Sequence, residues 1–130
     1  NKIFHFARFD VAVLKFYLGA NVKNIYCTKV SSKLARTFSE KHGLKDLVKE
    51  IIGVDMSKQM QSSDWGAEKL SEKQLKYAAS DCIYLHQLKR ELNKMLVREN
   101  RMELFNKCMK FLSTRVDLDL SDYKNDIFSH

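Results

Sequence analysis

The stretch SEKQLKYAASD, residues 71–81, begins the longest helix that the sequence predicts. Ser71 and Gln74 occupy the N-cap and third helical positions of a capping box, a pattern that satisfies the free backbone N–H groups at a helix start. Apolar residues then recur every three or four positions, so the helix is expected to continue to about residue 97. These apolar residues are Leu75, Ala78, Ala79, Cys82, Leu85, Leu88 and Leu92.

Upstream of this helix, the sequence predicts short strands that alternate with helices. Strands are expected at Lys2–Phe6 and Asn24–Cys27, which are short apolar runs. A first helix is predicted beyond Arg8, and Gly19 should end it. Two more are predicted before residue 54, one capped by Thr28 or Ser31 and closed by Gly43, the other closed by Gly53. The apolar positions of the first of these helices are Val11, Leu14, Tyr17 and Leu18. Those of the second are Val30, Leu34, Ala35 and Phe38, and those of the third are Leu44, Leu47, Val48, Ile51 and Ile52.

The remaining segments predict a loop and a last helix. Residues 54–69 have no clear period and are expected to form a loop anchored by Trp65. A helix is predicted from the spacing of Met102, Phe105, Met109 and Leu112, whereas Val116, Leu118 and Leu120 alternate and weakly suggest a strand. With no repeat, linker or low-complexity tract, residues 1–130 are expected to lie in one domain.

The number of strands bounds the fold class. A buried strand at residues 2–6 needs neighbours on both edges, yet only one other strand is predicted, and a two-stranded sheet is marginal. The expected fold is therefore the later, mostly helical portion of an α/β domain whose first strands lie upstream of Asn1.

Composition narrows the class of protein further. The chain carries 23 Lys and Arg against 16 Asp and Glu, a formal net charge of +7, which favours a polyanionic partner such as nucleic acid. No apolar run is long enough to span a bilayer, so no membrane association is expected. The three cysteines, Cys27, Cys82 and Cys108, form no C-x-x-C pair, which disfavours zinc and disulfides and points to the cytoplasm.

Three residues are candidates for chemistry. Tyr77 and Asp81 are four apart, so on a helix they differ by about 40° around the axis and about 6 Å along it. Asp10 ends the motif HFARFD at residues 5–10 and can supply another acidic oxygen if the fold brings it close. Carboxylates hold divalent cations, and a phenol can orient a bound water. Without further support, the preferred interpretation of Asp10 is a first-turn carboxylate favoured by the helix dipole. The ordinary alternatives are a core residue for Tyr77 and a solvated residue for Asp81.

Taken together, the motifs resemble the ribonuclease D-like 3′–5′ exonucleases of the DEDD superfamily. The resemblance rests on five segments in order, namely HFARFD, NIYCTKVSSKLART, HGLKDLVKE, QSSDW and YAASDCIYL, and it covers nearly the whole chain. It implies a ribonuclease H-like fold. Tyr77, four before Asp81, places the chain in the tyrosine branch of that superfamily. The tail resembles that of short members that lack extra C-terminal helical domains.

The resemblance also implies a site. In that family four acidic residues bind two divalent cations, Mg²⁺ or Mn²⁺; Asp10 and Asp81 match two of them, and Tyr77 matches the residue that positions the attacking water. The other two belong to an upstream D-x-E strand, which residues 1–130 do not contain. This fragment is therefore expected to be inactive by itself and to require that upstream segment.

Substrate contacts are expected from a further set of residues, His5, Arg8, Lys58, Gln61 and Trp65. Each has an ordinary structural alternative: a hydrogen-bonded strand histidine, solvated polar side chains, and a tryptophan that packs its loop.

The function that the resemblance implies is metal-dependent trimming of single-stranded RNA 3′ ends, in particular those of transfer RNA precursors. Three alternatives stay open: the same chemistry on DNA, a nucleic-acid-binding fragment without catalysis, and a helical domain that docks a partner helix through the apolar stripe of residues 102–112.

Overall fold

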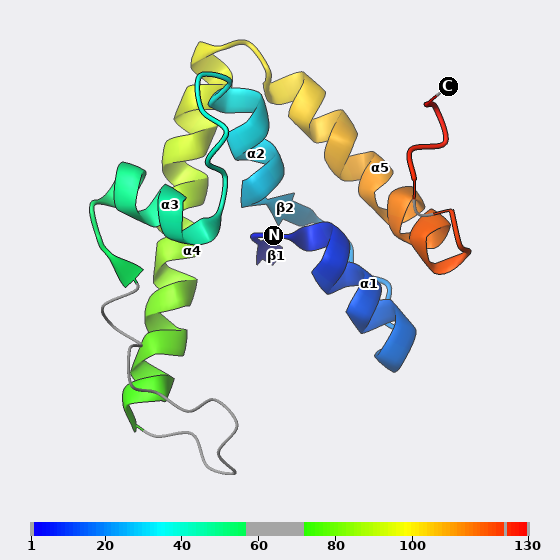
Figure 1. The fold of residues 1–130 in the computed structure, drawn as a ribbon, viewed down its shortest axis with the longest axis horizontal. Helices are drawn as coiled ribbons and strands as arrows, with labels where there is room; N and C mark the ends of the chain where they lie inside the picture. Colours follow the sequence, from blue (N-terminus) through cyan, green and yellow to red (C-terminus); the bar gives the residue numbers. More distant parts are fainter. Residues whose placement is uncertain (1, 57–71, 124, 130) are drawn as a thin grey trace.

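Two short parallel strands lie at the centre of the molecule with helices on both sides (Figure 1). The computed structural model describes residues 2–56, 72–123 and 125–129, and side chains in the second range from Ile83 onward. The elements are β1 (Lys2–Phe4), α1 (Ala7–Leu18), β2 (Ile25–Cys27), α2 (Thr28–Ala35), α3 (Leu44–Leu47), the π-helical turn η1 (Val48–Ile52), α4 (Glu72–Arg98) and α5 (Met102–Leu120). The chain is thus a mostly helical α/β domain with a small parallel sheet.

The strands and α1 form a β–α–β unit. Ile3 pairs with Tyr26 in parallel register, and α1 supplies the crossover that parallel strands require. Gly19 ends α1 in the left-handed conformation, with φ of 64°, and its N–H bonds the carbonyl of Lys15 at 2.9 Å, as the sequence predicts. The first strand is shorter than predicted because the N–H groups of Phe9 and Asp10 bond the carbonyl of Phe6, which starts the helical turn there.

Alternating side chains of β2 join two parts of the core. Cys27 packs with Ala7 and Val11 of α1 and with the C-terminal half of α5. Tyr26 points the other way, as strand geometry requires, and packs with Leu96 of α4 and Phe105 of α5. The short sheet therefore ties both long helices together.

The segment after α2 departs from the prediction. Helix α2 ends at Ala35, and Gly43 is the N-cap residue of α3 rather than the end of α2. The buried guanidinium of Arg36 explains this: it pairs with Glu50 and donates to the carbonyl of Lys41, which holds residues 36–42 as a loop. Phe38, predicted to be apolar core, is 77% exposed.

The predicted caps of α2 are also wrong. Thr28 is the first helical residue, and its hydroxyl donates to the carbonyl of Phe4 instead of capping the helix. The Ser31 hydroxyl donates back to the carbonyl of Thr28.

The helical segment of residues 44–52 is confirmed, although its second half is a π-helical turn. Gly53 ends it with φ of 87°. Leu47 and Val48 are fully buried against Leu88 and Leu92 of α4. This packing places α3 and η1 against the outer side of α4 (Figure 1).

Helices α4 and α5 confirm the two long helical predictions, with one correction. The chain is helical to Leu120, so the weak strand predicted at residues 116–120 is wrong. Leu112 and Val116, four apart, are both buried on the side that faces α1, which is helical rather than alternating periodicity.

The apolar stripe of α5 packs inside the chain. Phe105 and Leu112 are almost fully buried, so the alternative that this stripe docks a partner helix is wrong. The predicted cap Ser71 and the loop anchored by Trp65 lie outside the described residues. In the parts of the chain that the structure describes, no helix is long and apolar enough to cross a membrane.

Candidate functional site

The candidate site begins at the carboxyl ends of the two strands, where ligands bind in open α/β sheets. His5 follows β1 directly, Thr28 follows β2 directly, and Asp10 lies in the first turn of α1. Because Phe4 pairs with Cys27 in parallel register, the residues that follow the two strands lie at the same end of the sheet.

Asp10 is a half-buried carboxylate that has no partner among the described residues. In the described part of the chain, no side chain donates a hydrogen bond to it or forms an ion pair with it, and burial raises its pKa above the ordinary value of 3.8. A carboxylate that loses water without gaining a donor is unfavourable in the folded state. A divalent cation would supply the missing positive charge, so Asp10 fits the role of a cation ligand.

This environment predicts a pH effect that separates a functional from a structural Asp10. Because the pKa is raised in the folded state, ionised Asp10 opposes folding, and this penalty grows as pH rises through the range just above 3.8. We expect wild-type protein to lose stability relative to Asp10→Asn between pH 4 and pH 7, measured as urea midpoints without divalent cations. A relative gain for the wild type would instead indicate a stabilising carboxylate at the helix start.

His5 is neutral at physiological pH. Burial, with a smaller contribution from Lys29, lowers its pKa to about 4, and its Nδ1 lies 2.9 Å from the hydroxyl of Thr28. A neutral imidazole can exchange hydrogen bonds with a ribose or base but does not form an ion pair with phosphate. The predicted substrate role of His5 stays a prediction, limited to neutral hydrogen bonding.

Arg8 joins the site to the far end of the chain. Its guanidinium forms a bidentate pair with Asp119 at 2.6 and 2.7 Å, and Asp119 also accepts a hydrogen bond from Arg115 at 3.1 Å. The guanidinium of Arg8 holds the pKa of Asp119 below its ordinary value. A contact of Arg8 with substrate stays a prediction, and the pair with Asp119 already fixes the first turn of α1 against α5.

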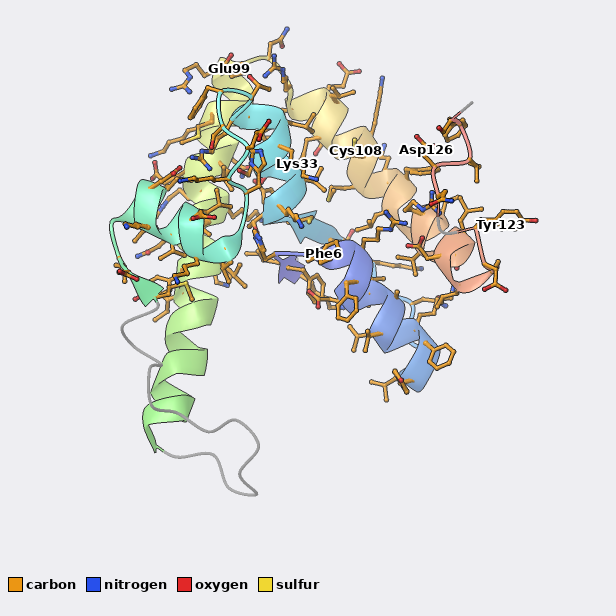
Figure 2. All side chains as sticks on the ribbon, viewed as in Figure 1. Phe6, Lys33, Glu99, Cys108, Tyr123 and Asp126 are labelled. Carbon is orange, nitrogen blue, oxygen red and sulfur yellow. The ribbon has the colours of Figure 1, made fainter. Side chains whose placement is uncertain are left out.

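A pair of exposed aromatic rings lies at the start of α1, close to Asp10 in the sequence, and sequence reasoning missed it. Phe6, labelled in Figure 2 beside the start of α1, is 45% exposed, and Phe9 is 60% exposed. Their rings stack with centroids 6.1 Å apart. The ammonium of Lys29 lies 4.3 Å from the centre of the Phe6 ring. Exposed rings beside a cation are suited to stacking nucleobases. The signal was present in the motif HFARFD, because residues three apart share one helix face.

The other predicted site residues are placed less fully. Tyr77 and Asp81 both lie in α4, four residues apart, but their side chains are outside the described part, as are Lys58, Gln61 and Trp65. Among the described residues, no group of three or more His, Cys, Asp or Glu is placed to hold a metal ion. The convergence of Asp10 with Tyr77 and Asp81 therefore stays a prediction.

Comparison with known proteins identifies the class. The 3′–5′ exonuclease family matches residues 1–97, and the chain belongs to this family. Within it, the chain is of the ribonuclease D and NrnC type. It is 33% identical over 102 residues to ribonuclease D of Gluconacetobacter diazotrophicus, covering 78% of this chain and 26% of that protein. DNA polymerase I of Aquifex aeolicus is 39% identical over 92 residues, which are 71% of this chain and 16% of the polymerase.

Solved structures agree over almost the entire chain. Brucella melitensis NrnC with bound Mg²⁺ superposes with a TM-score of 0.87 at 49% identity, and the same protein bound to pGG with 0.85 at 51%. Each match covers 99% of this chain and 63% of the Brucella chain. The chain therefore spans about a quarter of the ribonuclease D relative and less than two thirds of the Brucella nuclease.

Proposed function

We propose that this chain contributes to a metal-dependent 3′–5′ exoribonuclease, with Asp10 and Asp81 as cation ligands and Tyr77 as the residue that orients the attacking water. The observation that carries the proposal is Asp10, a half-buried carboxylate without a described partner at the carboxyl ends of parallel strands. The Mg²⁺ bound to the Brucella relative supports a divalent cation as cofactor, Mg²⁺ or Mn²⁺.

In this proposal the site residues have separate roles in phosphodiester hydrolysis. Two divalent cations, when bound, supply charge that activates water and neutralises the phosphate and the leaving oxygen. Asp10 and Asp81 hold that charge in place, while the phenol of Tyr77 accepts or donates a hydrogen bond to the water. A phenol ordinarily keeps its proton up to about pH 10, so this residue type suits orienting the water rather than removing its proton. Phe6 and Phe9 stack terminal bases, and neutral His5 contacts the ribose or base edge.

RNA 3′ ends are the proposed substrate, with transfer RNA precursors as the class that resemblance to ribonuclease D suggests. A second substrate class has an observation in its favour: the Brucella relative is solved with the dinucleotide pGG. The exposed area of two stacked phenylalanine rings also suits one or two bases rather than a folded RNA. DNA remains the alternative within the same chemistry.

The test is a comparison of substrates that carry a 5′ label. The dinucleotide pGG, a single-stranded RNA of about 20 nucleotides, a transfer RNA precursor with a 3′ trailer and a matching DNA are incubated with Mg²⁺, Mn²⁺ or EDTA. Exonuclease action predicts a ladder that shortens from the 3′ end and disappears in EDTA. The substrate with the highest kcat/KM then identifies the class.

A non-catalytic outcome is distinguishable in the same experiment. If the protein binds the labelled RNA but releases no product with either cation, the nucleic-acid-binding alternative replaces the exonuclease proposal. Residues 1–130 are assayed alone and mixed with the part of Brucella NrnC that has no counterpart in them. Activity only in the mixture would support the need for further acidic residues.

A further inference from the structure

We propose that a groove between α1, residues 20–25 and α5 binds a nucleotide unit, either a free nucleoside monophosphate or one nucleotide of an RNA strand. This basic groove is a second site, separate from the carboxyl ends of the strands. The choice of a nucleotide over other anions rests on the proposed function, whereas the groove and its charge come from the structure alone.

The groove has the size and position of a small-molecule site. Its volume is about 650 Å³, within the range of roughly 300–1,000 Å³ typical of ligand pockets. Val11 and Lys15 line it from α1, and it reaches the amino end of β2 at Ile25. His5 and Asp10 are at the opposite ends of the strands and are not among its lining residues. Figure 1 shows α5 running beside α1, and residues of both helices line the groove.

Charge favours an anion in the groove. Lys15, Lys23 and Lys110 line it against a single carboxylate, that of Asp117, which pairs with Lys15. In the described part of the chain neither Lys23 nor Lys110 has an ion-pair partner, so the lining carries a net charge of about +2. Two unpaired ammonium groups on one concave surface attract phosphate more strongly than isolated surface lysines do.

The rest of the lining suits a ribose and a base. Asn21, Asn24 and Asn106 line the groove, and their side chains make no hydrogen bond to any described residue. Free amides can pair with the edge of a base or with ribose hydroxyls. Val22 and Met109 are partly buried against the core beneath the groove and offer an apolar surface for the flat base.

An acidic protein segment is the competing occupant, and the lining argues against it. Carboxylate side chains would satisfy the lysines but would leave three free amides and an apolar wall unused. A nucleotide uses all three features at once. The position also fits an exonuclease, because a groove beside α1 could hold released product or RNA behind the terminal nucleotide.

The experiment measures binding without catalysis. Adenosine 5′-monophosphate and a tetra-adenylate with phosphorothioate linkages are titrated in EDTA at low salt, with adenosine and a glutamate decapeptide as comparisons. Lys23→Glu/Lys110→Glu is compared with Lys45→Glu/Lys49→Glu, which changes the same charge on exposed residues of α3 and η1. Circular dichroism verifies that both variants are folded.

We expect the groove variant to lose at least about tenfold in affinity for one phosphorylated probe, and the control variant to stay within about threefold. Loss for the monophosphate identifies a free-nucleotide site, and loss for the tetra-adenylate alone identifies an RNA-strand site. Equal losses in both variants, absence of binding in the wild type, or equal affinity for the glutamate peptide would overturn the proposal. So would a change of oligomeric state between wild type and groove variant in sedimentation, because the groove would then be a protein interface. Hydrolysis in Mg²⁺ is assayed separately. The binding results in EDTA can therefore be interpreted even if the exonuclease proposal fails.

Discussion

Replacing Asp81 by asparagine should lower Mg²⁺-dependent hydrolysis of RNA about a thousandfold. Asparagine keeps the shape of the side chain but loses the negative charge that a hard cation requires. A catalytic cation supplies several kcal/mol of charge stabilisation, and each 1.4 kcal/mol is a factor of ten in rate. Single-turnover rates with saturating enzyme measure the effect. The assay uses residues 1–130 alone if they hydrolyse RNA, and otherwise their mixture with the remaining part of Brucella NrnC. Binding of the same RNA in EDTA should change by less than about threefold, because no cation is present to be lost.

Tyr77→Phe is the matched comparison on the same helix. Both substitutions fall on α4 and remove one polar function without changing side-chain size much. The loss should be smaller, about ten- to a hundredfold, because the cations stay bound and only the orientation of the water suffers. A larger loss for Tyr77→Phe than for Asp81→Asn would contradict the assigned roles. Rescue of Asp81→Asn by higher Mg²⁺ concentration, without rescue of Tyr77→Phe, would support them.

Local signals in the sequence predicted most of the helical architecture. Gly19 and Gly53 end helices in the left-handed conformation, which glycine adopts at no steric cost, and apolar spacing predicted α4 and α5. These features depend on residues a few positions apart. The predicted helices form in the folded protein because their periodic apolar faces are buried, as at Leu88, Leu92 and Leu96 of α4.

Features that depend on distant partners could not be predicted. The loop after α2 exists because Arg36 turns inward to pair with Glu50, and no local pattern marks that pairing. The ion pair of Arg8 with Asp119 joins residues 111 positions apart. The strand suggested at residues 116–120 failed for the same reason: alternation over five residues is weaker than the burial of Leu112 and Val116 against α1.

The candidate site shows the same division. The order of the motifs predicted the family, which the match over residues 1–97 confirms. The burial of Asp10 and the stacking of Phe6 on Phe9 could not be predicted from the sequence, because both depend on how α1 packs against the sheet. The family alone does not reveal which groups surround the carboxylate.

The second large effect concerns the core rather than the site. Phe105→Ala should destabilise the protein by about 3–5 kcal/mol, the usual cost of removing a buried phenylalanine ring. Phe105 is 2% exposed, and its ring centroid lies 4.8 Å from that of Tyr26. It also packs with Leu96 of α4, so one ring joins β2, α4 and α5. A domain of this size has a total stability of roughly 5–15 kcal/mol, so the variant should unfold at a much lower urea concentration, measured by circular dichroism at 222 nm.

Phe111→Ala is the control on the same helix. Phe111 is 39% exposed and lies beside the exposed Phe128, so its removal should cost less than about 1 kcal/mol. Equal losses for the two substitutions would mean that helix propensity, which is the same for both, dominates over burial. A loss confined to Phe105→Ala would show that burial of this ring between β2, α4 and α5, rather than helix propensity, supplies the stability.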